Sequence, residues 1–152
     1  MGRRSEKTPS ADGPVWRHVV RNDLSAVGAA NDSLEQFLQS LNVDPEVVFP
    51  VLLSLEEVVT NIIKYGYDDD GEHEILMEVR LSPGEIVLRV TDDGHEFDPR
   101  QARPAALEGP VEDRPVGGLG IHLVRNLAQR LSYARVGGKN VLSLCFSLKP
   151  KP

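Results

Sequence analysis

The chain has 152 residues, the length of a single domain, and 40% of them are hydrophobic, which is enough for one core. A formal net charge of −6 argues against nonspecific binding to nucleic acid or to an anionic membrane surface. No apolar run reaches the length of a membrane span, and the single cysteine allows no internal disulfide, so we expect a protein of the reducing cytoplasm.

The first 14 residues are polar and have no hydrophobic stretch after their two arginines, so we expect a disordered tail and no secretory signal. Residues 15–150 are expected to form one domain. Its first element, residues 15–21, is rich in β-branched residues and predicts a strand. Asn22 and Asp23 then precede a predicted helix. Its apolar positions recur at helical spacing: Leu24, Val27, Leu34, Phe37, Leu38 and Leu41.

A second, longer helix is predicted from Asp44 to about Gly66. An aspartate followed by Pro45 is typical of a helix start, and a glycine is typical of a helix end. One face of this helix is apolar: Val48, Leu52, Leu55, Val59 and Ile62. At about 100° per residue, the opposite face carries a polar stripe of Glu57, Asn61 and Lys64. Such a stripe is either a solvated helix face or part of a site between apolar flanks.

Two segments of alternating hydrophobicity, residues 73–81 and 85–91, follow an acidic turn and predict a β-hairpin. The turn between them is Ser82-Pro83-Gly84. Residues 100–116 then show no periodicity, which predicts a mobile loop of a length that is uncommon without a function.

A third helix is predicted directly after the glycine-rich segment 117–120, with Leu123, Val124, Leu127 and Leu131 on one face. Residues 132–136 and 140–148 predict a second hairpin, in which Cys145 is expected to be a buried structural cysteine. This order of elements predicts an α/β sandwich of two layers, with a mixed, mostly antiparallel sheet and the helices on one face.

Two glycine-containing turns could carry chemistry. Asp92 ends a predicted strand, and Gly94 lets the chain reverse there. A carboxylate facing a cavity at that point can accept a hydrogen bond from an exocyclic amine such as that of adenine. The alternative is an ordinary turn capped by an aspartate. The second turn, Gly117 to Gly120, can bring backbone N–H groups close to a phosphate at a helix N-terminus, or can simply be a bend.

The polar stripe of the long helix offers three further groups. Asn61 has a neutral oxygen suited to Mg²⁺, and Glu57, one turn earlier, can accept a proton from an attacking hydroxyl. Lys64 can lie near a phosphate, or can simply interact with the helix dipole. Glu56 is the rival carboxylate, about 100° away on the helix.

Taken in order, Glu57-x-x-x-Asn61, Asp92-x-Gly94 and Gly118-x-Gly120 resemble the nucleotide-binding boxes of the GHKL superfamily of gyrase B, histidine kinases and heat-shock chaperone ATPases. Three segments are similar to its small single-domain members, the RsbW-like anti-sigma factor serine kinases: EEVVTNIIKYGY, TDDGHEFDP and GGLGIHLVRNLAQRLSY. The resemblance covers about residues 24–148 and implies the Bergerat ATP-binding fold. One departure is Glu96, which stands where the wider superfamily often has a second glycine.

The resemblance also implies a role for individual residues. Asn61 would ligate the Mg²⁺ that bridges the ATP phosphates, Asp92 would hold the adenine amine, and Glu57 would be the general base. Residues 100–116 would form the lid. Contacts with the cofactor are implied at Asn61, Lys64, Asp92, Gly94, Phe97, Gly117, Gly118, Leu119, Gly120 and Ile121.

The implied function is that of an ATP-Mg²⁺-dependent protein serine/threonine kinase and anti-sigma factor. Its substrate would be a serine or threonine of an anti-anti-sigma factor of the STAS type, and the group commonly also binds a sigma factor and forms a homodimer. We expect no direct nucleic acid or membrane partner. The alternative is a non-catalytic ATP-binding module that sequesters a partner, and only Glu57 favours the kinase over this module.

Overall fold

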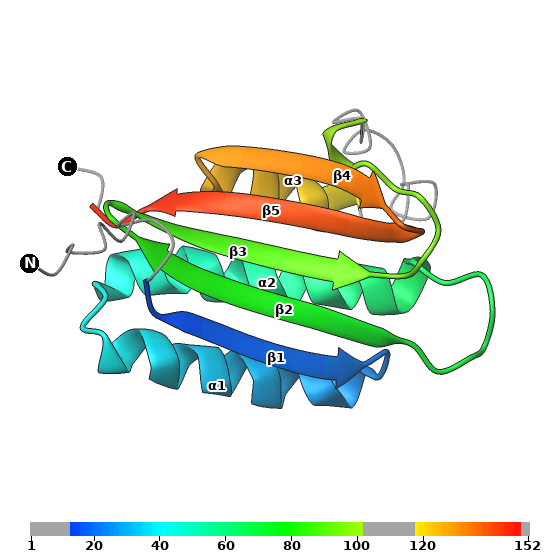
Figure 1. The fold of residues 1–152 in the computed structure, drawn as a ribbon, viewed down its shortest axis with the longest axis horizontal. Coiled ribbons are helices and arrows are strands. Elements are labelled where there is room, and N and C mark those ends of the chain that lie inside the picture. The colour runs from blue at the N-terminus through cyan, green and yellow to red at the C-terminus, as the bar shows by residue number, and fades with distance from the viewer. Residues whose placement is uncertain (1–12, 102–117, 150–152) are drawn as a thin grey trace, which may run out of the picture.

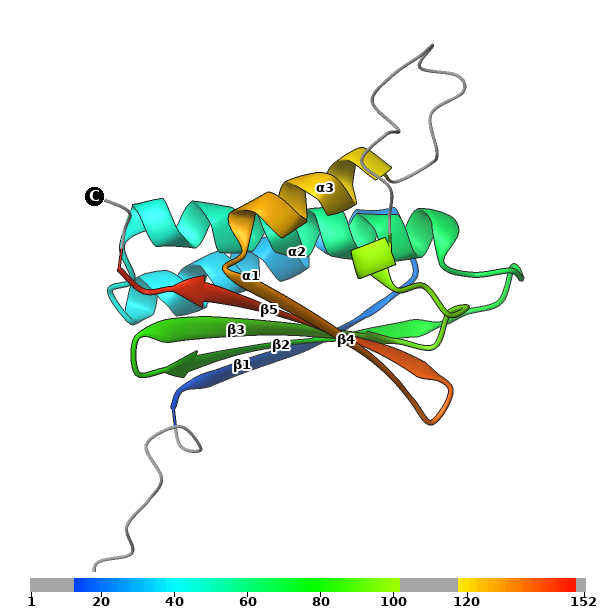
Figure 2. The ribbon, with the colours of Figure 1, turned by 90° about the horizontal axis from the view of Figure 1, so that it is seen from above.

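A computed structural model describes residues 13–101 and 118–149, which form a five-stranded sheet with three α-helices packed on one face (Figures 1 and 2). The strands are β1 (Val15–Arg21), β2 (Glu74–Ser82), β3 (Glu85–Asp92), β4 (Arg130–Val136) and β5 (Lys139–Ser147). The helices are α1 (Val27–Ser40), α2 (Pro45–Tyr65) and α3 (Gly118–Leu127). Most of the predicted tail, most of the predicted lid, and Gly117 lie outside the described residues.

The strand order is β1-β2-β3-β5-β4, and each pairing in the described part of the chain is antiparallel. The predicted α/β sandwich with helices on one face is therefore confirmed. The sheet was predicted to be mixed and mostly antiparallel, and its described strand pairs are all antiparallel. The last strand, β5, lies between β3 and β4 (Figure 1). The carboxyl end of β3 thereby meets the start of β5, where Asp92 pairs with Asn140.

Helix α2 begins and ends where the sequence predicts. The side chain of Asp44 accepts a hydrogen bond from the backbone N–H of Glu46, Pro45 occupies the first turn, and Gly66 caps the C-terminus. The helix buries one face against the sheet: Val47, Val48, Val51, Ser54, Leu55, Val58 and Val59. On the opposite face of its C-terminal half, Glu57 and Asn61 are half-buried.

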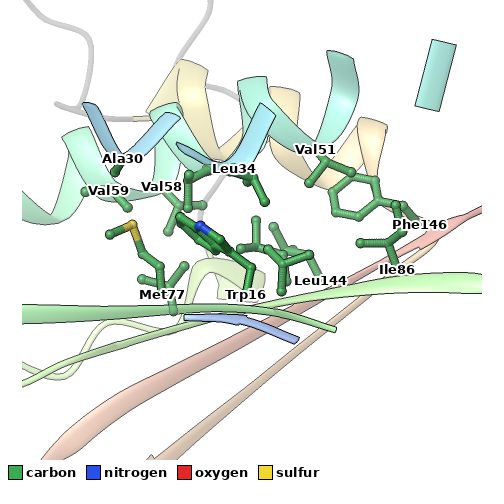
Figure 3. Packing of buried hydrophobic residues seen from close by; sticks show 14 of the residues in the cluster. Trp16, Ala30, Leu34, Val51, Val58, Val59, Met77, Ile86, Leu144 and Phe146 are labelled. Carbon is green, nitrogen blue, oxygen red and sulfur yellow. The ribbon is translucent and has the colours of Figure 1, made fainter. Parts of the chain in front are cut away.

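The core lies between the helices and the sheet (Figure 3). The helix-facing positions of β2 and β3 are almost all buried, as their alternation predicts. Trp16 of β1 is buried in the same layer, and its indole N–H donates to Oγ of Ser33 on α1 over 3.0 Å. This core holds α2 against β3, which sets the distance between the polar stripe of the helix and the end of that strand.

The predictions for four residues are wrong. Leu24 is 47% exposed because it lies in a 3-10 turn, Leu24–Ala26, where the 3.6-residue period does not apply. Leu123 is exposed and Ile121 is buried in its place, whereas Leu131 belongs to β4 because α3 ends at Leu127. Cys145 is only half-buried, since the alternation of β5 turns it to the face that the helices do not cover.

None of the helices in the described ranges is both long enough and apolar enough to cross a bilayer.

Candidate functional site

A cavity of about 220 Å³ opens between the C-terminal half of α2, the turn after β3, the β4–β5 hairpin and the N-terminal part of α3. Four of the predicted site residues, from three separate segments, line it together: Asn61, Asp92, Phe97 and Ile121. The remaining lining residues are Ile62, Tyr65, Gly66, His95, Pro99, Tyr133, Asn140 and Leu142. A mostly apolar wall with a few polar groups is typical of a small-molecule site.

Asp92 is the carboxylate among the described residues that line this cavity. It is the last residue of β3 and is 6% exposed. Its Oδ1 accepts hydrogen bonds from the backbone N–H of Gly94 over 2.9 Å and from Nδ2 of Asn140 over 3.1 Å. Burial raises the pKa of Asp92, and these two hydrogen bonds together with the charge of Arg135 oppose the rise. No described residue donates a hydrogen bond to Oδ2, so this oxygen is the acceptor available to a ligand.

The turn after Asp92 is pressed against the end of α2, and Gly94 makes this possible. A Cβ at Gly94 would lie 2.3 Å from the carbonyl oxygen of Gly66 and 2.9 Å from Oδ1 of Asp92. The N–H of His95 donates to the same Gly66 carbonyl over 2.9 Å. Backbone atoms leave no room for a side chain here, so the glycine allows the turn after Asp92 to pack against the helix that carries Asn61.

The polar stripe of α2 is only partly inside the cavity. Asn61 is half-buried and lines it. Glu57, one turn earlier, is half-buried but is not among the lining residues, and its carboxylate lies against Gly120 of α3. Lys64 and Glu56 are exposed, and neither lines the cavity.

The glycine-rich segment runs into α3, which begins at Gly118. Ile121 is 3% exposed and forms part of the cavity wall, so the N-terminal turns of α3 lie beside the cavity. The first N–H groups of a helix have no intrahelical partner and favour an anion. Gly118 and Leu119 are the first two residues of α3.

Sequence reasoning missed the β4–β5 hairpin as a wall of the site. Asn140 is 6% exposed and donates a hydrogen bond to Asp92. Tyr133 lines the cavity, and Arg135 donates to the carbonyl oxygen of Gly94 over 2.8 Å. One signal was available in the sequence. The alternation of β5 places Asn140 on the same face as Leu142, Leu144 and Phe146, and a polar residue on an apolar face calls for a specific partner.

A histidine joins the acidic turn after α2 to the end of β3. Nε2 of His73 lies 2.7 Å from Oδ1 of Asp69, and Nδ1 lies 3.0 Å from Oδ1 of Asp93. The hydrogen bond to Asp69, and to a smaller extent the one to Asp93, raises the pKa of His73. Its ring stacks on Tyr67, whose hydroxyl is buried without a hydrogen-bond partner in the described residues. Burial is the main reason that the pKa of Tyr67 is raised.

Within the described ranges, no group of three or more His, Cys, Asp or Glu side chains is arranged to hold a metal ion.

Comparison with known proteins gives one matching family and several relatives in sequence. The family described as a histidine kinase-like ATPase domain matches residues 20–146. The serine/threonine-protein kinase BtrW of Bordetella bronchiseptica is 30% identical over 103 residues, which are 68% of this chain and 72% of that protein. The serine-protein kinase RsbW of Bacillus thuringiensis is 30% identical over 94 residues, which are 59% of this chain and 58% of that protein.

A solved structure, that of the RsbU and RsbW domains of a Mycobacterium tuberculosis protein, has a similar fold. Its TM-score is 0.63 at 16% sequence identity, and the match covers 88% of this chain and 32% of the other. At this level of identity the likeness concerns the fold alone.

Proposed function

The chain belongs to the histidine kinase-like ATPase domain family, and on this premise we propose that it is an ATP-dependent protein serine/threonine kinase of the RsbW type. The single observation that carries the proposal is the convergence of Asn61, Asp92 and Ile121 on one cavity. Each comes from a different one of the three motifs, and they are separated by up to 60 positions in the chain.

The residues of the cavity fit a purine nucleotide. Oδ2 of Asp92 is an acceptor without a donor among the described residues, as an exocyclic amine requires. The apolar side chains of Ile62, Ile121 and Leu142 offer surfaces for the faces of a flat base. The N-terminal turns of α3 favour the negative charge of phosphates.

Asn61 is the proposed protein ligand of a Mg²⁺ ion bound together with the phosphates. When bound, the ion would neutralise charge on the transferred phosphoryl group, which is the main requirement of this reaction. The side chain of Asn61 supplies a neutral oxygen, so it positions the ion without adding negative charge near the phosphates. Lys64 is proposed to act at longer range from its exposed position.

Glu57 is the proposed general base, which takes the proton of the substrate hydroxyl as the hydroxyl attacks. Its carboxylate lies one helical turn from Asn61 and against Gly120, at the junction of α2 and α3. A partner that presents a serine there would have to approach over the start of α3. The proposed lid, residues 100–116, lies almost entirely outside the described residues.

The proposed substrate is a serine or threonine of an anti-anti-sigma factor of the STAS type, and a sigma factor is the proposed alternative partner. A homodimer and a cytoplasmic location complete the proposal. The chain spans 58% of the length of the RsbW relative, so the activity and partners of the whole protein are proposals for this chain.

Nucleotide binding is tested first, by calorimetry with ATP and Mg²⁺. Asp92→Asn should weaken ATP binding roughly 10- to 100-fold, because the exocyclic amine loses its carboxylate acceptor. Asn61→Ala should weaken binding of Mg-ATP more than binding of ATP without Mg²⁺. If neither substitution changes the affinity, the nucleotide site is wrongly assigned.

Phosphoryl transfer is tested next, with γ-labelled ATP and a purified STAS-domain protein from the same organism. Glu57→Gln should keep the ATP affinity and reduce transfer by about 10²-fold or more. Glu56→Gln is the matched control, because its side chain is exposed, does not line the cavity and lies about 100° around the helix from Glu57. Equal rates in the two variants would remove Glu57 from the mechanism.

A second candidate function is an ATP-binding module that sequesters a partner without phosphorylating it. One observation favours it, namely that the carboxylate of Glu57 does not line the cavity. Wild-type protein that binds Mg-ATP but transfers no phosphate to any STAS-domain protein of its organism would support this module over the kinase.

A further inference from the structure

Three neighbouring strands bring Asp92, Asn140 and Arg135 into one row across the sheet. Asp92 of β3 pairs with Asn140 of β5, and Asn140 pairs with Arg135 of β4. Residues in register point to the same face of a sheet, and here that face carries the helices and the cavity. A slip of one residue in β5 would turn Asn140 to the opposite face, so the strand register decides this arrangement.

The orientation of the Asn140 amide follows from its neighbours. Nδ2 faces three acceptors: Oδ1 of Asp92 at 3.1 Å, the carbonyl oxygen of His95 at 2.8 Å and that of Gly94 at 3.4 Å. Oδ1 faces three donors, which are the Tyr133 hydroxyl, Nη1 of Arg135 at 3.1 Å and the backbone N–H of Phe97 at 3.4 Å. Turning the amide over would set donors against donors, so only one orientation satisfies the hydrogen bonds.

This single orientation has a consequence for Asp92. The amide of Asn140 and the N–H of Gly94 both donate to Oδ1. The carboxylate plane is thereby held with Oδ1 toward the protein, and Oδ2 remains without a donor from the described residues. Without Asn140, the carboxylate would keep only the Gly94 hydrogen bond on one edge and could rotate about its Cβ–Cγ bond.

We propose that Asn140 is a positioning residue for base selectivity, which orients the Asp92 carboxylate so that Oδ2 accepts a hydrogen bond from the 6-amino group of a purine nucleotide. Tyr133 and Arg135 act through Asn140 by fixing its amide. A base with a carbonyl oxygen at position 6 would set acceptor against acceptor and would be rejected. This proposal rests on the proposed function, because a base is read only if the cavity holds a nucleotide.

The test compares ATP with purine riboside triphosphate, which lacks only the 6-amino group. Affinities are measured by calorimetry with Mg²⁺ on the full chain. The wild type should prefer ATP by roughly 10-fold or more, the range expected for one buried hydrogen bond. Asn140→Asp has nearly the same shape and keeps an acceptor for Tyr133 and Arg135, but cannot donate to Asp92 as a carboxylate. It should reduce the preference to within about 3-fold, mainly by weakening ATP binding.

The matched control is Asn126→Asp, which makes the same change of charge at an exposed position of α3. It should keep the wild-type preference. If Asn140→Asp weakens both nucleotides equally and keeps the ratio, Asn140 has a structural role only and the proposal is overturned while the nucleotide site stands. If the wild type binds neither nucleotide, the proposed function fails, and this proposal fails with it.

A pH profile separates positioning from folding. The hydrogen bond from Asn140 lowers the pKa of Asp92, so replacing it with a second carboxylate should raise that pKa further. As the pH is lowered, the Asp92 carboxylate should therefore become protonated, and ATP affinity should begin to fall, at a higher pH in Asn140→Asp than in the wild type. An unmoved midpoint would contradict the proposal. Should Asn140→Asp fail to fold, Tyr133→Phe removes one donor to the amide without a change of charge, and its ATP preference should drop about 2- to 5-fold. An unchanged preference would overturn the proposal.

Discussion

Oε2 of Glu57 lies so close to Gly120 that any side chain at this position would press against it. A Cβ built on Gly120 would lie 2.5 Å from this oxygen, which is the far end of a flexible side chain. The glycine therefore has a specific use: it leaves room for a carboxylate of α2 against the N-terminal part of α3. This relationship makes the role of Glu57 testable without mutating Glu57 itself.

Gly120→Ala should displace the Glu57 carboxylate and leave the backbone of α3 in place, because alanine favours the helix. We expect phosphate transfer to fall by about 10²-fold, as for loss of a general base, while ATP affinity changes less than about 3-fold. Rates with γ-labelled ATP and calorimetry on the same preparation check this. A variant with full transfer activity would show that the position of the carboxylate does not matter.

Gly94→Ala should be destabilising, because its Cβ would meet the carbonyl oxygen of Gly66, a backbone atom that cannot move aside freely. We expect a loss of about 1–3 kcal/mol in the free energy of unfolding, typical of overpacking at a buried site. ATP affinity should fall as well, since the turn positions Asp92. Urea denaturation and calorimetry provide the two measurements.

Gly28→Ala is the matched control for this substitution. Gly28 lies in α1, and no atom outside its own helix segment is within 4 Å of an added Cβ. The alanine should stabilise the protein by about 0.5–1 kcal/mol through helix propensity. Equal effects of the two substitutions would contradict the close contact between Gly66 and Gly94.

Stability should depend on pH through His73. Its two ring nitrogens both face carboxylate oxygens, and only the protonated ring can donate to both. The pKa of His73 is raised on folding, so its contribution is fully present below the unfolded value near 6.5 and is lost as the pH rises through the folded value. The pKa of Asp69 is lowered, so its contribution is lost as the pH falls below its unfolded value of 3.8.

We therefore expect the difference in unfolding free energy between wild type and His73→Gln to be larger at pH 5.5 than at pH 8.5. Urea denaturation at a series of pH values gives this difference. His122→Gln is the control, because within the described ranges the ring of His122 pairs with no carboxylate. The pH dependence should be weaker in this variant than in His73→Gln. A flat profile for both variants would show that the ion pairs of His73 do not contribute to the free energy of unfolding.

Lys64 and Asn61 lie one turn apart on α2 but should differ in their effect on nucleotide binding. Lys64 is exposed and outside the cavity lining, so Lys64→Ala should weaken ATP binding at most about 3-fold at low salt. The loss should vanish at about 1 M salt, where the screening length is near 3 Å. The Mg²⁺-dependent loss in Asn61→Ala should persist, since a direct ligand is removed. A large, salt-resistant loss in Lys64→Ala would indicate direct phosphate contact.

Much of the fold was predictable because its signals are local. The aspartate-proline start and glycine end of α2, and the period-2 alternation of β2 and β3, each depend on residues within one element. Leu24 and Leu131 show where this reasoning stops, because Leu24 lies in a 3-10 turn and α3 ends at Leu127, so neither residue follows the period of an α-helix.

The three motifs were also visible in the sequence, since the order of a few polar residues and glycines is enough to recognise them. Only the tertiary structure decided which other residues surround Asp92. Asn140 lies 48 positions away and meets it because β5 pairs with β3 in one register, and the Gly66–Gly94 contact depends on how α2 packs over that strand. Residue types record local preferences, whereas contacts between distant segments arise from strand pairing and the packing of a shared core.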